Sequence, residues 1–203
     1  MAATPSTRLE PASRDWLLRT AAIAIESSLA GASTAPPEVS RLLPELQELR
    51  ASFVTLTITG DLRGCCGTLE PRLPLAVDVW TNARSSAFRD PRFLPLGRHE
   101  WRRTRLEVAV LTPPERLTAE DETGLLAQLV PGEHGLVLAW RGSRATFLPK
   151  VWEQLPDPRD FLRHLKLKAG WNPAFWATDI EIWRYRTEVM AVDSPAQLAA
   201  VPP

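Results

Sequence analysis

Two cysteines stand side by side in residues 62–68, which read Leu-Arg-Gly-Cys-Cys-Gly-Thr and hold both cysteines of the chain. Arg63 lies two residues before Cys65, and a cation near a thiol favours the thiolate, which is the nucleophile and the metal ligand. Gly64 and Gly67 flank the pair, and glycine in a strand marks a bulge or a close approach of another group to the backbone. The stretch therefore predicts either a reactive or ligand-contacting thiol at Cys65 or a small buried one.

The cysteine pair fits neither a disulfide framework nor a zinc site. Neighbouring Cα atoms lie about 3.8 Å apart, whereas relaxed disulfides need about 4.4–6.8 Å. The other ligands of a structural zinc site are not spaced around the pair. We expect no metal and no cofactor.

An alternating, β-branched segment at residues 51–59 predicts a strand before the cysteines. Gly60-Asp61 suits a two-residue hairpin loop with glycine first. In that register Leu56 lies opposite Cys65, which places the thiol on the apolar side and favours burial. A bulge at either glycine would reverse the side.

The remaining elements alternate between amphipathic helices and short strands. Ser13 is a plausible N-cap for a helix that ends at Gly31, and Pro74 opens a second helix that Pro91 terminates. Asp157-Pro158 opens a third helix, ending at Gly170. Further strands are predicted at residues 106–111, 135–140, 145–148 and 178–190. We expect one domain over residues 13–195, with residues 1–12 and 196–203 as loose termini.

Composition restricts the classes of function. The chain has 203 residues, with 24 Lys plus Arg and 24 Asp plus Glu, so its net charge indicates neither nucleic-acid nor membrane binding. The basic cluster Trp101-Arg102-Arg103 with Arg105 is too short to indicate a nucleic-acid interface. No segment is apolar enough to span a bilayer and the N-terminus lacks a signal-peptide core, so we expect a cytoplasmic protein.

Arg63 has two interpretations, because an unpaired charge on an inward face is costly. Either it forms an ion pair with Glu107, Asp90 or Glu188, or it binds an anionic group of a ligand. The glycine next to it, Gly64, would let that ligand reach the backbone.

Other polar residues also have a structural and a functional interpretation. Asp90-Pro91-Arg92 is either a capping corner or part of a ligand site, and His134 is either a loop hydrogen-bond partner or a general base. Arg184 and Arg186 share one face of a strand, which is either solvated or binds a ligand. Glu188 is a second candidate for proton transfer.

With these motifs in place, the sequence resembles the AMMECR domain family, known in prokaryotes as AmmeMemoRadiSam system protein A. One departure is Cys66, where the family usually has isoleucine, so we expect Cys66 to pack in the interior. The matching stretches are Phe53-Val54-Thr55-Leu56, Leu62-Arg63-Gly64-Cys65, Gly67-Thr68, Asp90-Pro91-Arg92-Phe93, Pro95-Leu96, Val108 to Pro113, His134-Gly135-Leu136, Leu148-Pro149 with Val151, Lys168-Ala169-Gly170, and Arg184-Tyr185-Arg186 with Glu188.

The resemblance implies an α+β fold with a mainly antiparallel sheet flanked by helices, divided into a larger and a smaller lobe with a cleft between them. It also implies a Memo-like protein and a radical SAM protein as partners. Two functions stay open. One is a substrate- or partner-binding module acting through the Leu-Arg-Gly-Cys cleft, with a possible anionic small-molecule ligand. The other is an enzyme subunit with Cys65 as nucleophile, Arg63 as anion clamp, and His134 or Glu188 for proton transfer.

Overall fold

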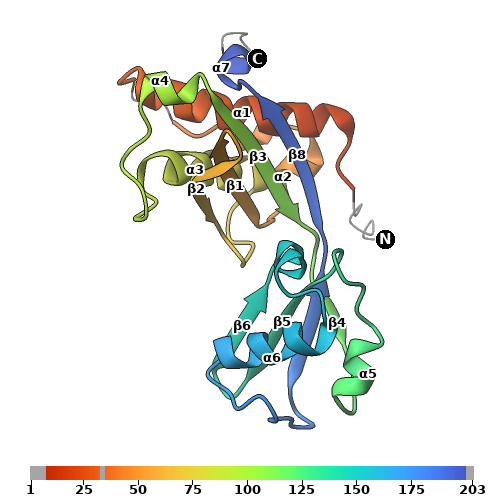
Figure 1. Cartoon of the computed structure of the whole chain (residues 1–203). Coiled ribbons are helices and arrows are strands. Elements are labelled where there is room, and N and C mark those ends of the chain that lie inside the picture. Colours follow the sequence, from red (N-terminus) through yellow and green to blue (C-terminus); the bar gives the residue numbers. More distant parts are fainter. Residues whose placement is uncertain (1–7, 33–34, 200–203) are drawn as a thin grey trace. The chain divides into compact units, whose positions relative to one another are not determined.

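The computed structural model describes residues 8–32 and 35–199 (Figure 1). The chain divides into two compact units, each with its own sheet. Among the described residues, the first unit comprises 8–32, 35–111 and 188–199, and the second comprises 112–187. Each unit is described below by itself.

The first unit is a four-stranded sheet covered by helices. Its strand order is β2-β1-β3-β8, and β1 pairs antiparallel with both β2 and β3. The strands are β1 (Ser52–Ile58), β2 (Asp61–Gly67), β3 (Thr104–Leu111) and β8 (Thr187–Asp193). The helices are α1 (Pro11–Leu29), η1 (Val39–Arg41), α2 (Pro44–Gln47), α3 (Leu75–Phe88), α4 (Arg98–Trp101) and α7 (Ala196–Ala199).

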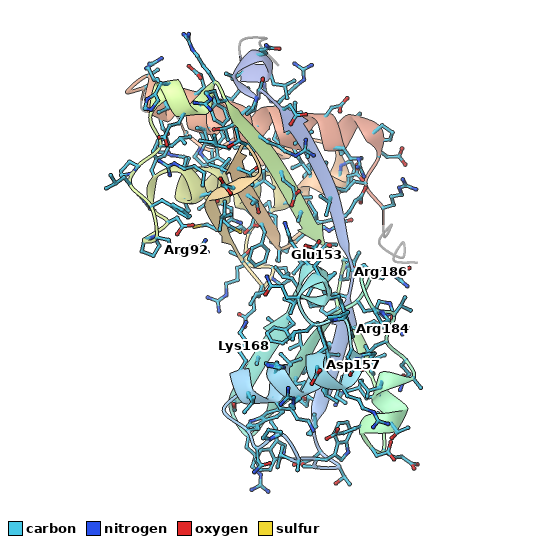
Figure 2. All side chains as sticks on the ribbon, viewed as in Figure 1. Arg92, Glu153, Asp157, Lys168, Arg184 and Arg186 are labelled. Atoms are coloured by element: carbon cyan, nitrogen blue, oxygen red, sulfur yellow. The ribbon has the colours of Figure 1, made fainter. Side chains whose placement is uncertain are left out.

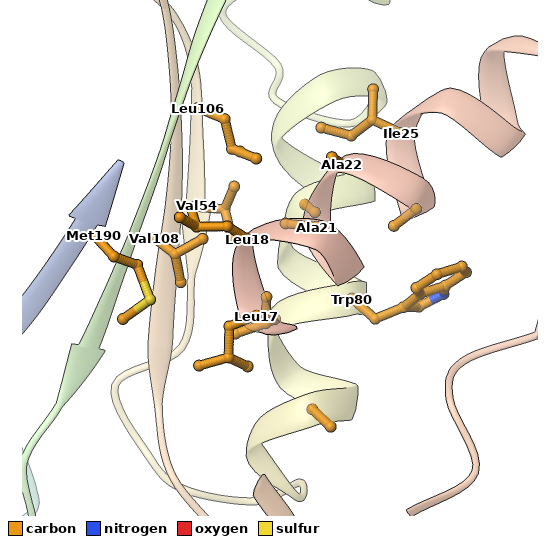
Figure 3. Packing of buried hydrophobic residues seen from close by; sticks show 14 of the residues in the cluster. Leu17, Leu18, Ala21, Ala22, Ile25, Val54, Trp80, Leu106, Val108 and Met190 are labelled. Carbon is orange, nitrogen blue, oxygen red and sulfur yellow. The ribbon is translucent and has the colours of Figure 1, made fainter. Parts of the chain in front are cut away.

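One face of this sheet packs on α1 and α3. Alternate strand residues such as Val54, Leu106 and Val108 are fully buried against Leu17 and Ala21 of α1 (Figure 3). Burial of such side chains contributes about 1.5–3 kcal/mol each, so this two-layer core supplies much of the unit's stability. The residues between these buried ones point to the opposite face of the sheet, and their side chains are half-buried or exposed.

Both long helices of the first unit follow the predicted pattern, with shifted ends. Helix α1 begins at Pro11 rather than after Ser13, which is buried inside the helix, so Pro11 and Ala12 do not belong to a loose lead-in. Pro74 immediately precedes α3, which ends at Phe88. The helical turn α7 occupies part of the expected loose C-terminus; residues 1–7 and 200–203 lie outside the described part.

The β1–β2 hairpin has a different register from the predicted one. Its turn residues are Thr59 and Gly60, both with positive φ (53° and 92°), and Ile58 pairs with Asp61. The pairing then shifts between Leu56 and Thr57, so that Leu56 lies opposite Gly64. The prediction that Leu56 faces Cys65 is therefore wrong.

Gly64 is required by the close approach of α3. A Cβ at this position would lie 2.1 Å from the carbonyl oxygen of Ser86. The Ser86 hydroxyl in turn accepts from the Cys66 N–H (2.8 Å) and donates to the Val54 carbonyl (2.7 Å). The helix thus bridges the paired residues Val54 of β1 and Cys66 of β2 through one side chain.

The second unit has its own four-stranded sheet, in the order β4-β7-β5-β6. Its elements are β4 (Glu115–Leu117), α5 (Glu122–Leu126), β5 (Gly135–Trp140), β6 (Ser143–Phe147), η2 (Pro149–Glu153), α6 (Pro158–Lys168) and β7 (Glu181–Tyr185). Asp157 caps α6 by accepting from two backbone N–H groups. The single strand predicted at residues 178–190 is two strands, β7 and β8, which belong to different sheets.

Helix α6 buries a lysine together with its apolar face. Phe161, Leu162 and Leu165 point into the core, as their spacing predicts. Lys166 is also fully buried, and its ammonium group bonds the carboxylate of Glu122 and the carbonyl of Pro173 (3.0 Å). No helix in the described ranges has the length and apolarity needed to cross a bilayer.

Gly64→Ala tests the contact between α3 and the hairpin. The added methyl meets backbone rather than a flexible side chain, so we expect the free energy of unfolding to fall by about 1–3 kcal/mol or more. Gly124→Ala in α5 is the matched control, because alanine is favoured there by up to about 1 kcal/mol. Urea unfolding followed by tryptophan fluorescence measures both. A Gly64→Ala protein as stable as the wild type would contradict the close approach.

Candidate functional site

One ion pair holds both the backbone N–H and the backbone carbonyl of Cys65. The Cys65 N–H donates to Oδ2 of Asp90 (2.8 Å), and Nη2 of Arg92 donates to the Cys65 carbonyl (3.2 Å). Arg92 also binds both carboxylate oxygens of Asp90, through Nε and Nη2 (2.9 and 2.7 Å). Arg92, and then the Cys65 N–H, hold the pKa of Asp90 far below its usual range.

The thiol of Cys65 lies on the sheet face opposite to the helices. Cys65 pairs with Thr55, whose hydroxyl lies 3.3 Å from Sγ. We call this side the outer face; it carries Phe53, Thr55, Thr57, Cys65, Glu107 and Ala109, all half-buried. The apolar environment that the hairpin prediction gave to Cys65 is therefore wrong, because the register shift turns the thiol to the other side.

Cys66 takes the side that was predicted for Cys65. It lies opposite Val54 and points toward α3, and it is half-buried rather than interior. Burial, and then the charge of Asp90, raise the pKa of its thiol, which a contact with Ser86 partly offsets. The two adjacent thiols thus face opposite sides of one strand.

Arg63 is paired, but with none of the three carboxylates that were expected. Its Nε and Nη2 donate to the two oxygens of Glu100 (2.8 and 3.0 Å), and Nη2 also donates to the Leu94 carbonyl (2.9 Å). The side chain is 14% exposed. Because the Glu100 carboxylate binds two nitrogens of the guanidinium group, the geometry favours an ion pair within the protein over ligand binding by Arg63. The pair fixes the segment that leads into α4 against β2.

Glu188 lies on the helix-covered side of the sheet, away from the outer face. Its carboxylate accepts from the Leu9 N–H (2.8 Å) and pairs with Arg14. It therefore anchors the start of α1 to β8. Within the first unit the structure does not bring Glu188 and Cys65 together.

His134 belongs to the second unit and is 2% exposed. Its Nδ1 accepts from the Val130 N–H (3.0 Å), so the proton of the neutral ring is on Nε2, which has no partner within the described residues. Burial, and then the charges of Arg186 and Arg184, lower the pKa of the imidazole. The ring is therefore neutral at pH 7.

Arg184 and Arg186, which Figure 2 labels, also belong to the second unit. Each pairs with a different carboxylate. Arg184 binds both oxygens of Glu115 (2.8 and 2.9 Å) and the Gln128 carbonyl. Arg186 follows β7 and lies 3.4 Å from a carboxylate oxygen of Glu133. The prediction that both lie on one strand is wrong, because β7 ends at Tyr185.

Sequence reasoning missed a buried polar cluster at the base of the hairpin. The Asp78 carboxylate is 1% exposed and accepts from the Ser52 N–H and hydroxyl, the Thr68 hydroxyl and the Asn82 amide. The sequence contained a signal for this cluster, because Asp78 and Asn82 lie four residues apart on the apolar stripe of α3. Two polar residues on a buried helix face predict a buried hydrogen-bond network. Within residues 8–32 and 35–199 no group of three potential ligands is placed to hold a metal ion.

Antiparallel sheets flanked by helices define an α+β protein, as the sequence predicted, and a solved structure shares this fold. It is an uncharacterized protein from Pyrococcus horikoshii, 31% identical, with a TM-score of 0.78 over 92% of this chain and 95% of that one. A protein of Methanosarcina acetivorans is 37% identical over 155 residues, covering 76% of this chain and 77% of the relative. A protein of Methanocaldococcus jannaschii is 34% identical over 185 residues, which cover 89% of this chain and 90% of the relative.

The AMMECR1 family model matches residues 18–190. The chain belongs to the AMMECR1 family, which confirms the resemblance carried by its motifs. The cleft between the lobes stays a prediction.

The Arg63–Glu100 pair predicts a pH-dependent stability. Arg63 lowers the pKa of Glu100 from 4.5 to about 2. Because the folded pKa is the lower one, the pair's contribution is complete above about pH 4.5 and is lost as pH falls toward 2. We expect Glu100→Gln to flatten the dependence of the unfolding free energy on pH over this range, measured by urea titrations.

Arg63→Met provides the second arm of this test. It should flatten the same profile and, because a charged hydrogen-bonded partner is lost, destabilise the protein at pH 7 by about 1.5–3 kcal/mol. A Glu100→Gln profile with the wild-type slope would show that the pair does not form in solution.

Proposed function

We propose that this protein is component A of a cytoplasmic modification system containing a Memo-like protein and a radical SAM protein. In this proposal it is a binding module whose contact surface is the outer face around Cys65. The observation that supports it most is that Asp90 accepts from the Cys65 N–H and Arg92 donates to the Cys65 carbonyl, which fixes a half-buried thiol on the sheet face away from α1 and α3.

The state of three candidate site residues, Glu188 for proton transfer and Arg63 and Asp90 for ligand binding, favours contact by a partner over catalysis. Asp90 is engaged by Arg92, Glu188 by Arg14, and Arg63 by Glu100. A group that is already hydrogen-bonded must give up those bonds before it can bind an anion or move a proton. The Cys65 thiol on the outer face, by contrast, contacts a neutral hydroxyl, that of Thr55 (3.3 Å).

Substitution on the outer face tests the module. Thr57→Arg places a long charged side chain beside Cys65's strand, whereas Thr81→Arg places it on the exposed side of α3 as a matched control. We expect Thr57→Arg to weaken binding to the purified Memo-like or radical SAM protein of the same genome by about tenfold or more. Biolayer interferometry measures the affinities. Equal affinities for both variants would place the contact elsewhere, and the absence of binding by the wild type would remove the proposal.

One observation favours an enzyme subunit as the second candidate. The Thr55 hydroxyl lies 3.3 Å from Sγ of Cys65, so a hydrogen-bond donor accompanies the positioned sulfur. In this version the Cys65 sulfur loses its proton and attacks an acyl or alkyl donor, forming a thioester or thioether as the donor's leaving group departs. Arg63 is not the anion clamp, because Glu100 already binds its guanidinium.

Thiol reactivity separates the two candidates. At pH 7.5 Cys66 should alkylate slowly, because burial raises the pKa of its thiol and reduces the thiolate fraction. If Cys65 is a nucleophile, the Cys66→Ser protein should react with iodoacetamide about tenfold faster than the Cys65→Ser protein, as followed by intact-mass spectrometry. Similar rates would eliminate the enzyme candidate and leave the binding module.

A further inference from the structure

A pocket of about 920 Å³ lies in the first unit beside α4 and α7. This volume is in the range of pockets that hold small molecules, about 300–1,000 Å³. Its wall carries Arg102 and Arg103, from the basic cluster that is too short to indicate a nucleic-acid interface, together with Arg98 from the start of α4. The structure therefore gives the cluster a concave site of its own.

The positive charge in this pocket is largely uncompensated. Glu26 is the acidic residue of the lining, and its carboxylate already accepts from the Trp101 indole (2.7 Å) and lies 3.7 Å from Arg98. The guanidinium groups of Arg102 and Arg103 are exposed, and neither forms an ion pair or hydrogen bond with any residue the structure describes. Three arginines therefore share one glutamate.

The wall is also held in place before any ligand arrives. Trp101 is 1% exposed and anchors α4 in the core, and Glu100 binds the N–H of Gly97 at the start of the helix. The same Glu100 carboxylate is clamped by Arg63. Arg98 donates to the Leu29 carbonyl (3.0 Å), which restricts its side chain. A preorganised site loses less conformational entropy on binding.

We infer that this pocket binds a small molecule that carries at least two phosphate or carboxylate groups. The guanidinium fork matches the geometry of both groups and binds them through paired, charge-assisted hydrogen bonds. Arg98 is partly satisfied by Glu26. Arg102 and Arg103, which have no ion-pair partner in the described part of the chain, provide one guanidinium for each anionic group. The pocket lies off the outer face, since its lining contains none of the residues that define that face, so this site is independent of the proposed function.

Isothermal titration calorimetry at about 0.15 M salt, with pyrophosphate, citrate and phosphate as probes, tests the site. We expect pyrophosphate or citrate to bind with one-to-one stoichiometry and more tightly than phosphate. The double variant Arg102→Gln, Arg103→Gln should weaken this binding by about tenfold or more, as expected for the loss of charged hydrogen bonds.

The matched control is Arg41→Gln, Arg72→Gln, which removes the same charge from exposed arginines outside this pocket. It should bind like the wild type. Equal weakening in both double variants would show general charge attraction and overturn the site, as would the absence of one-to-one binding. A single-stranded oligonucleotide that binds more tightly than pyrophosphate, with the same dependence on Arg102 and Arg103, would also overturn it in favour of a nucleic acid.

Discussion

One buried carboxylate fixes the geometry on which the first unit depends. Asp78 extends from α3 to the beginning of β1 at Ser52 and to Thr68, directly after β2, and so ties the helix to both ends of the hairpin. Burial raises the pKa of this group, and its four hydrogen-bond donors offset that cost. With the base of the hairpin held here and Gly64 pressed against Ser86, the position of the Cys65 thiol follows.

Local patterns predicted the elements better than their register. The alternation that indicated β1 and the apolar stripe of α3 are properties of short segments, and the structure contains both. The hairpin turn was placed one residue too late, because Thr59 adopts a positive φ that a non-glycine residue seldom takes. The register shift beside Arg63 then moved Cys65 to the opposite face. The register shift has no signal in the hairpin sequence alone, since it brings Gly64 against Ser86 of α3, which lies outside the hairpin.

Partners that are distant in sequence account for most of what could not be predicted at the site. Arg63 needed a carboxylate, which the cost of an unpaired charge made clear, but Glu100 is one of several candidates until the chain folds. Lys166 is similar: its helix face was predictable, whereas its burial depends on Glu122 and on the Trp176 ring 5.6 Å away. Physical chemistry thus predicted the requirement, and tertiary structure selected the residue that meets it.

The hydrogen bonds around Cys65 have a consequence for the protein as a solute. β2 is an outermost strand of its sheet, and outward N–H and C=O groups on such a strand can recruit a strand from another chain and start aggregation. Asp90 and Arg92 occupy these groups at Cys65 with a charged pair that an incoming strand would have to displace. The Asp90–Arg92 pair that positions the thiol therefore also hinders pairing of another chain's strand with the middle of β2.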